Sequence, residues 1–243
     1  MKSFNITEFE SYIKGLTVKR KIKMLQLHHT YSPSYKNFTG NNHMELQKAM
    51  KNHHVKTNGW ADIGQHFTIF PDGIIMTGRS LDVNPAGIYG ANTGAICIEC
   101  LGNFDKGGDK MREEQKKSVV AVLKTLLDKF SLNPESNVTY HAWWASDGRE
   151  IGDYVKGHSV KTCPGTDFFG GNTLTSYESN LMPLVKKYKS SNLSEVTTVN
   201  DIIWELGNAG IITDSNLWIK KSTEDINIYW LCRKMANKLR GVS

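Results

Sequence analysis

Three separated segments of the chain carry side chains that bind metal ions. His28 and His29 end a strand-like run at residues 21–29, and His141 ends a second run at residues 138–141. Cys163 lies in a turn-forming stretch farther along the chain. Two imidazoles and one thiolate can make a three-ligand zinc site whose fourth position takes water, as catalytic zinc sites do. These residues by themselves still favour the plainer alternative, in which two strand-end histidines and a loop cysteine never meet.

The chain has eight histidines, so the choice of two ligands needs an argument. Neighbouring residues of a strand face opposite sides, so that only one of His28 and His29 can face a given side of the sheet. His158, shortly before Cys163, is the rival of His141 for the second ligand position. We favour His141, because a strand end holds a ligand more rigidly than a glycine-rich loop. We predict structural or supporting roles for His53, His54 and His66.

The chain has four cysteines, which are too few and too scattered for a disulfide scaffold, and we expect them to be reduced. Cys97 and Cys100 stand three residues apart in an apolar run. In a strand such residues point to opposite faces, so this pair cannot hold one ion. We predict that both are buried apolar side chains.

Apolar periodicity indicates the elements that must position these side chains. A helical stripe covers residues 113–130, and the turn Pro71-Asp72-Gly73 joins two strands into a hairpin. Strands interleaved with helices predict an α/β fold with a mixed central β-sheet flanked by helices. The predicted strands are residues 21–29, 65–70, 74–77, 95–101 and 138–141, and the predicted helices are residues 42–54, 113–130 and 176–188.

The composition changes near residue 189. The polar stretch 189–194 has the composition of a linker, and it separates a main domain, residues 1–188, from a small C-terminal helical module, residues 195–243. Apolar spacing predicts a module of three helices that packs its own small core. These helices are predicted at residues 199–207, 216–222 and 225–239.

The overall composition excludes several classes of protein. Hydrophobic residues make up 39% and charged residues 22% of the 243 residues, which is ordinary for a globular protein. No run approaches the roughly 20 apolar residues of a membrane span, and residues 1–15 lack the pattern of a secretory signal. The net charge of +6 favours polyanionic partners in general. No organised basic helix or aromatic-basic platform indicates a nucleic-acid partner.

Four motifs, in their order along the chain, resemble one known family. They are LHHT at 27–30, GWADIGQHFTIFPDG at 59–73, AICIE at 95–99 and KTCPG at 161–165. Together they resemble the amidase-2 family of N-acetylmuramoyl-L-alanine amidases, which includes the T7-lysozyme-like phage endolysins and the peptidoglycan recognition proteins. The resemblance spans roughly residues 20–188 and is greatest to endolysins and autolysins of clostridia and their phages.

The resemblance implies a zinc site and the residues that serve it. The family's zinc ligands fall on His28, His141 and Cys163, the last in place of an aspartate in other members. Glu99 matches an acidic residue that some members use near the metal, and Lys161 matches an active-site lysine. A carboxylate between apolar neighbours is costly to bury, and a nearby zinc ion would offset that cost. The implied chemistry is metal-assisted hydrolysis, with Glu99 as general acid-base and Lys161 beside the developing oxyanion.

The chain departs from the family pattern in two places. Gln65 stands where many members have an active-site tyrosine, and a glutamine cannot act as acid or base. The segment between His141 and Cys163 is longer than in many members. A further question is whether some polar and aromatic residues line a substrate groove or, for the tryptophans, belong to the core. These residues are Trp60, Asn92, Thr93, Asn103, Trp143 and Trp144.

The resemblance implies hydrolysis of the amide bond between N-acetylmuramic acid and L-alanine in bacterial peptidoglycan, by a phage endolysin or an autolysin. We expect synthesis in the cytoplasm without a signal peptide, and action on the cell wall after release through a holin or by lysis. The expected partners are peptidoglycan and, from the charge, anionic wall polymers. Residues 195–243 would target the wall or mediate a homo-oligomer.

Two alternatives use the same residues. One is a non-catalytic peptidoglycan-binding protein on the same fold, and the presence of all three candidate ligands argues against it. The other is a zinc peptidase that cuts the stem peptide, which the order of the motifs does not favour.

Overall fold

The computed structural model describes residues 1–189 and, farther along, residues 203, 206, 210–214, 217–218 and 235. The chain divides into two compact units, Met1–Ser190 and Ser191–Ser243. The helices predicted at residues 199–207, 216–222 and 225–239 lie almost entirely outside the described residues, so the three-helix module stays a prediction. Among the residues that are described, no helix is both long enough and apolar enough to cross a membrane.

The first unit is built on a six-stranded sheet with the order β1-β4-β3-β5-β2-β6. The four strands β3, β5, β2 and β6 are parallel neighbours, while β4 pairs antiparallel with β1 and with β3. The sheet is therefore mixed, and the predicted fold class is confirmed. The strands are β1 (Ser3–Phe4), β2 (Met24–His29), β3 (Phe67–Ile69), β4 (Ile75–Thr77), β5 (Ala95–Cys100) and β6 (Val138–Tyr140).

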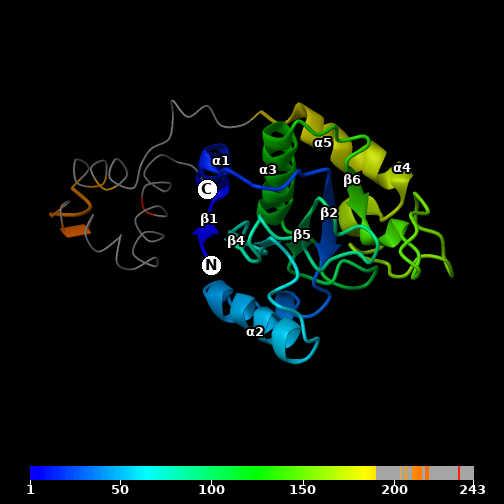
Figure 1. The fold of residues 1–243 in the computed structure, drawn as a ribbon. Coiled ribbons are helices and arrows are strands. Elements are labelled where there is room, and N and C mark those ends of the chain that lie inside the picture. Colours follow the sequence, from blue (N-terminus) through cyan, green and yellow to red (C-terminus); the bar gives the residue numbers. More distant parts are fainter. Residues whose placement is uncertain (190–202, 204–205, 207–209, 215–216, 219–234, 236–243) are drawn as a thin grey trace. The chain divides into compact units, whose positions relative to one another are not determined.

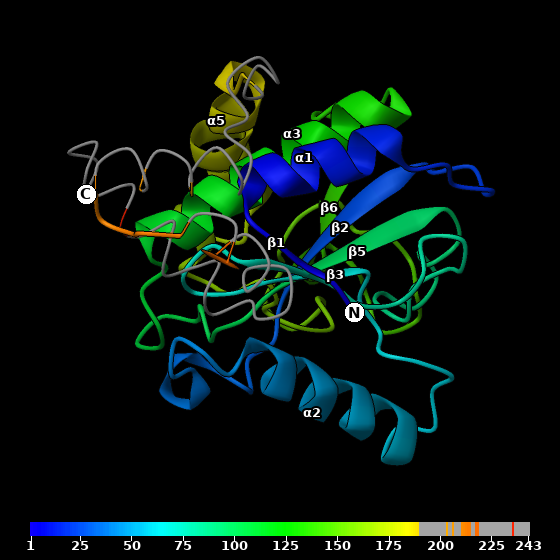
Figure 2. The same cartoon turned by 90° about the vertical axis from the view of Figure 1, so that its left-hand side faces the viewer.

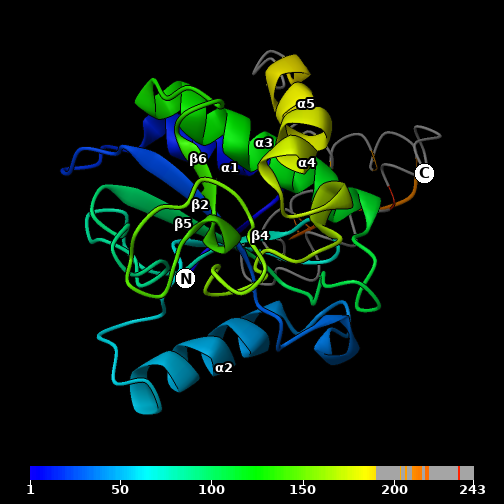
Figure 3. The same ribbon diagram turned by 90° about the vertical axis from the view of Figure 1, so that its right-hand side faces the viewer.

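Helices cover both sides of this sheet (Figure 1). Figure 2 shows α1 and α3 together on one face and α2 on the opposite side, and Figure 3 shows α5 next to α3 on the first face. The sheet is thus enclosed between two helical layers, as an α/β fold requires. The helices are α1 (Ile6–Gly15), α2 (His43–Lys56), α3 (Glu113–Phe130), α4 (Leu174–Ser176) and α5 (Met182–Lys187), with the 3-10 helices η1 (Tyr35–Asn37), η2 (His141–Trp143) and η3 (Phe168–Gly170) and the π-helix η4 (Tyr177–Leu181).

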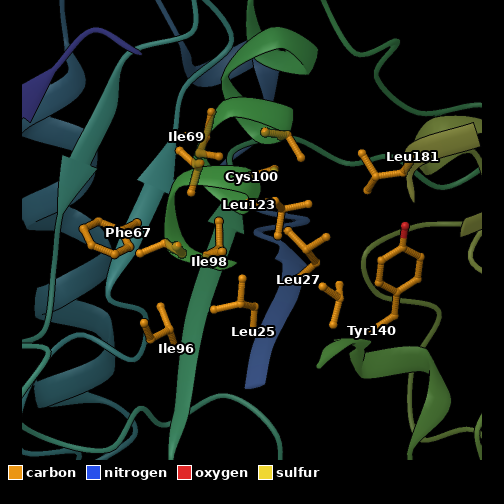
Figure 4. Close-up of a cluster of buried hydrophobic side chains, with 14 of the residues drawn as sticks. Leu25, Leu27, Phe67, Ile69, Ile96, Ile98, Cys100, Leu123, Tyr140 and Leu181 are labelled. Carbon is orange, nitrogen blue, oxygen red and sulfur yellow. The ribbon is translucent and has the colours of Figure 1, made fainter. Parts of the chain in front are cut away.

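The main hydrophobic core lies between the sheet and α3. Leu25 and Leu27 of β2 are fully buried and lie in the same cluster as Leu123 of α3 (Figure 4). Fully burying one such side chain stabilises the fold by roughly 1.5–3 kcal/mol. Because side chains alternate along a strand, Gln26 and His28 point to the opposite face of the sheet, on the side of α2. The cysteines predicted to be buried in β5 are indeed buried: Cys97 and Cys100.

The N-terminal segment forms two elements that the apolar pattern did not reveal. α1 begins after Asn5, whose side chain accepts a hydrogen bond from the Glu8 N–H at 3.2 Å, while the Glu8 carboxylate accepts from the Asn5 N–H at 2.8 Å. This reciprocal capping box satisfies two backbone donors at the start of the helix. Phe9 and Ile13 of α1 are buried in the core. The signal that predicts this helix is the asparagine followed three residues later by glutamate.

Candidate metal centre

Polar side chains form a row across one face of the sheet. In the parallel registers, His28 of β2 lies opposite Glu99 of β5, and Glu99 lies opposite Thr68 of β3. His141 directly follows β6, which is the other parallel neighbour of β2. Residues opposite one another in adjacent strands face the same side of the sheet. The carboxyl ends of these strands therefore present two histidines and a glutamate on one side, which is where parallel sheets bind ligands.

Backbone contacts bring Cys163 to the same place. The Ala142 N–H donates to the Cys163 carbonyl at 2.7 Å, and the His29 N–H donates to the Cys163 Sγ at 3.4 Å. The long segment before Cys163 folds back on itself, because Ala145 and Ser159 pair in a β-bridge. Its length therefore does not carry the cysteine away from the sheet.

His28, His141 and Cys163 each present a donor atom within 4.8 Å of the other two. The Nδ1 of His28 lies 3.3 Å from the Nδ1 of His141 and 3.5 Å from the Sγ of Cys163. Zinc–nitrogen bonds of about 2.0–2.1 Å and a zinc–sulfur bond of about 2.3 Å, at tetrahedral angles, separate two nitrogens by about 3.3 Å and a nitrogen from a sulfur by about 3.5 Å. The three side chains therefore fit a zinc ion. They are the one group of this kind in the part of the chain that the structure describes.

Burial sets the protonation of these three side chains. It lowers the pKa of His28 well below its usual value and the pKa of His141 to about 4, so both imidazoles are neutral and can donate a lone pair. Burial also raises the pKa of the Cys163 thiol to about 12. A thiolate at this position needs a positive charge beside it, and a metal ion supplies that charge.

Glu99 is the one side chain of β5 that is not fully buried. Desolvation nevertheless raises the pKa of its carboxyl to about 7, with the positive charge of Lys161 acting in the opposite direction. A carboxyl with a pKa near neutral pH can both take and return a proton. Lys161 is exposed, and its charge also acts on His28, His141 and Cys163. The structure thus places Glu99 beside the three donor side chains, and the charge of Lys161 acts on all four.

The other histidines have different surroundings. His158, the rival candidate for the second ligand, is exposed and does not join the group. The Nδ1 of His29 accepts a hydrogen bond from a backbone N–H at 3.2 Å. In the fully buried His66, Nδ1 accepts from the Cys97 N–H at 3.0 Å and Nε2 lies 2.9 Å from the Val83 carbonyl. His29 and His66 are therefore held by the backbone, which is a structural role.

The structure also assigns residues for which the sequence left two readings. Trp143 and Trp144 are core residues, because both are buried and their indole N–H groups donate to protein acceptors at 2.8 and 2.9 Å. Gln65 is buried, and its Nε2 donates to the Thr68 hydroxyl at 3.0 Å. It supports the strand beside Glu99 and does not replace a tyrosine chemically.

Sequence reasoning did not single out Gln26, which is buried two residues before His28 on the same face of β2. The alternation of side chains along the strand is the signal that could have found it.

The fold and the site together define a class of protein. It is a mixed α/β protein that carries a buried His–His–Cys donor set, with a carboxyl beside it, at the carboxyl ends of parallel strands, an arrangement suited to metal-assisted hydrolysis. Residues 18–166, more than half of the chain, match the family N-acetylmuramoyl-L-alanine amidase. The chain belongs to this family, and the resemblance of its motifs is confirmed.

Several individual proteins are similar to this chain. The human N-acetylmuramoyl-L-alanine amidase is 30% identical over 80 residues, which are 33% of this chain and 14% of the human protein, so the chain matches a small part of that relative. Drosophila PGRP-LB has the same fold, with a TM-score of 0.51 and 20% identity over 73% of this chain and 89% of that one. The amidase LysC from Clostridium intestinale is 26% identical over 61% of this chain and 80% of that one, with a TM-score of 0.45.

Proposed function

We propose that the chain is a zinc-dependent amidase that hydrolyses the bond between N-acetylmuramic acid and L-alanine in bacterial peptidoglycan. The observation that carries this proposal is the convergence of His28, His141 and Cys163 beside Glu99, in a chain of the amidase family. Three protein ligands leave a coordination position for a reacting molecule, and the carboxyl provides proton transfer. The activity named for the human relative supports the choice of bond.

Each residue of the site has a distinct part in this reaction. His28, His141 and Cys163 would hold the zinc ion, which when bound polarises a carbonyl and lowers the pKa of water toward about 7. Glu99, opposite His28 in the neighbouring strand, takes the proton of the attacking water and returns it to the leaving amino group of L-alanine. The positive charge of Lys161 stabilises the negative charge that develops on the amide oxygen.

We further infer a role as a phage endolysin or an autolysin, made in the cytoplasm and acting on the wall after release. The net charge of +6 supports binding to an anionic cell wall. The second unit, Ser191–Ser243, would bind the wall or a second copy of the chain. Wall binding and oligomeric state of the full chain, compared with a chain ending at Ser190, separate these two roles.

Digestion of purified peptidoglycan by the zinc-loaded chain tests the bond that is cut. We expect new amino groups on L-alanine and no new reducing sugar ends, measured by mass spectrometry and end-group analysis. Cys163→Ser should abolish the release. New reducing ends, or amino groups of other residues, would contradict the proposal. Wall binding without any release from a zinc-loaded protein would favour the non-catalytic alternative.

A further inference from the structure

Gln26 and His28 are buried neighbours on one face of β2, and each has a polar atom without a partner. The Nε2 of Gln26 donates to the Ala91 carbonyl at 2.9 Å, which fixes the orientation of the amide. The Oε1 of Gln26 and the Nε2 of His28 are both buried and have no hydrogen-bond partner among the described residues. Buried polar atoms are rarely left in this state, so both atoms call for an explanation.

The two unpartnered atoms border the same small space beside Gly87. A Cβ atom built on Gly87 would lie 2.3 Å from the Gln26 Oε1 and 3.3 Å from the His28 Nε2. The Oδ1 of Asn92 accepts hydrogen bonds from the Gly87 N–H at 2.9 Å and from the Ile88 N–H at 3.1 Å, and so holds this loop in place. The absence of a side chain at residue 87 therefore lets the amide oxygen and the imidazole nitrogen approach the same point.

The other nitrogen of His28 determines what Nε2 must do. Nδ1 is the atom that faces His141 and Cys163, at 3.3 and 3.5 Å. A neutral imidazole that donates its Nδ1 lone pair to a metal carries its proton on Nε2. Metal-binding histidines usually donate this second N–H to a carboxylate, a carbonyl or water, which fixes the ring and its tautomer. The amide oxygen of Gln26 is an acceptor already aimed at this region by the contact with Ala91.

We propose that Gln26 is a positioning residue of the metal centre, whose Oε1 accepts a hydrogen bond from the Nε2–H of His28 when the metal is bound. This bond selects the tautomer that leaves Nδ1 free to bind the ion, and it holds the imidazole ring toward His141 and Cys163. The inference rests on the proposed metal site, and it is independent of which bond of the substrate is cut.

Zinc affinity of the full chain, measured by competition with a chelator, tests this role. Removing a residue that orients a metal ligand typically weakens metal binding about 10- to 100-fold, and we expect this for Gln26→Met. Gln26→Glu, whose buried carboxyl in its protonated form keeps a donor toward the Ala91 carbonyl and an acceptor toward His28, should recover most of the loss. The Co²⁺-loaded Gln26→Met protein should also have an altered visible absorption spectrum, because the orientation of one ligand changes.

Gln47 of α2 provides a matched control. It is also fully buried, its Nε2 also donates to a backbone carbonyl, that of Thr77 at 3.2 Å, and its Oε1 also has no partner among the described residues. Gln47→Met therefore removes the same chemical groups away from the donor atoms, and it should leave zinc affinity unchanged. Equal zinc affinities of Gln26→Met and Gln47→Met would overturn the proposal.

Nuclear magnetic resonance of the ¹⁵N-labelled, zinc-loaded wild-type chain gives an answer that needs no variant. We expect His28 to carry its proton on Nε2 and this proton to exchange slowly with water. A His28 protonated on Nδ1, or a rapidly exchanging Nε2 proton, would overturn the proposal for Gln26. A wild-type chain that binds no zinc would instead remove the proposed metal site, and the role of Gln26 with it.

Discussion

Two buried histidines, His66 and His28, differ in the hydrogen-bond partners of their ring nitrogens. His66 precedes β3, and both of its ring nitrogens have backbone partners, the Cys97 N–H at 3.0 Å and the Val83 carbonyl at 2.9 Å. His28 is the next-to-last residue of β2, with its Nδ1 facing two other donor atoms and its Nε2 without a partner among the described residues. Burial lowers the pKa of both imidazoles, to about 3 for His66.

The difference shows that burial and a lowered pKa do not by themselves identify a ligand. The Nδ1 of His28 faces the lone pairs of a second imidazole and of a sulfur. A structural histidine such as His66 instead has a hydrogen-bond donor at one ring nitrogen and an acceptor at the other. Two imidazole nitrogens and a sulfur in contact satisfy one another only through a proton or a cation. Both ring nitrogens of His66 have partners within the protein, whereas the donor atoms around His28 could be satisfied by a metal ion.

The largest expected effect follows from removing one ligand of the incomplete site. His141→Ala should abolish wall hydrolysis and lower zinc affinity by more than 100-fold. Roughly 100-fold is the largest loss expected when a residue that only hydrogen-bonds to a ligand is removed. His158→Ala is the matched control, because His158 is exposed and lies in the segment between His141 and Cys163. Chelator competition and turbidity of wall suspensions measure the two effects. Loss of zinc from His158→Ala, with His141→Ala unaffected, would reverse our assignment of the second ligand.

A second substitution separates chemistry from metal binding within the same site. Glu99→Gln removes the group that moves the proton, and general acid-base catalysis contributes about 10²- to 10⁴-fold, so we expect kcat to fall by that factor. The three ligands are untouched, so zinc content should remain that of the wild type. An active Glu99→Gln variant would show that proton transfer lies elsewhere, and zinc loss would make Glu99 part of the ligand set.

The fold could be predicted where the sequence pattern is strong and local. The apolar stripe of α3 gave the observed bounds, Glu113–Phe130, and the strand predicted at residues 95–101 is β5 (Ala95–Cys100). The helix predicted at residues 176–188 is present as one continuous helical run of α4, the π-helix η4 and α5, but the π-turn inside it was not predicted. A π-turn changes the hydrogen-bond step without changing which residues are apolar, so periodicity does not reveal it.

The site could be predicted only in part. Each donor lies at a recognisable place, a strand end for His28 and His141 and a turn for Cys163. Their convergence depends on β2 lying between β5 and β6 and on the contact from the Ala142 N–H to the Cys163 carbonyl. Both are long-range features that no local pattern contains, so the residues alone left open whether the three meet. The order of the family motifs supplied that information.

Substitution of His66 tests the other side of the comparison with His28, because it should change stability and not zinc affinity. His66→Ala removes the hydrogen-bond partner of the buried Cys97 N–H and of the Val83 carbonyl, and such losses destabilise a fold by up to about 3 kcal/mol. Zinc affinity should not change, because the ring has no free lone pair to contribute. Chemical denaturation and chelator competition measure the two quantities. An unchanged free energy of unfolding with weakened zinc binding would place His66 in the metal site.

The smallest effect concerns the free energy of unfolding of the metal-free protein. The pKa of Glu99 is raised by desolvation from 4.5 to about 7, so the folded protein holds this proton more tightly than the unfolded chain does. Below about pH 4.5 both states are protonated, and Glu99→Gln should change nothing. As the pH rises from about 4.5 to about 7, the free energy of unfolding of the wild type falls, because the carboxyl ionises in the unfolded chain before it ionises in the folded protein. Above that pH the glutamine variant should be more stable by about 1–2 kcal/mol, less than the full shift implies because the side chain is partly exposed.

Zinc should reduce the difference in the free energy of unfolding between wild type and Glu99→Gln, since a bound cation stabilises the neighbouring carboxylate and lowers its pKa. Denaturation curves of wild type and Glu99→Gln at several pH values, with chelator and with zinc, measure the effect. Glu150→Gln, at an exposed position, is the control for the substitution itself. A stability difference that depends on neither pH nor zinc would mean that the Glu99 carboxylate does not interact electrostatically with the metal site. The contrast between His28 and His66 would then depend on the three donor atoms alone.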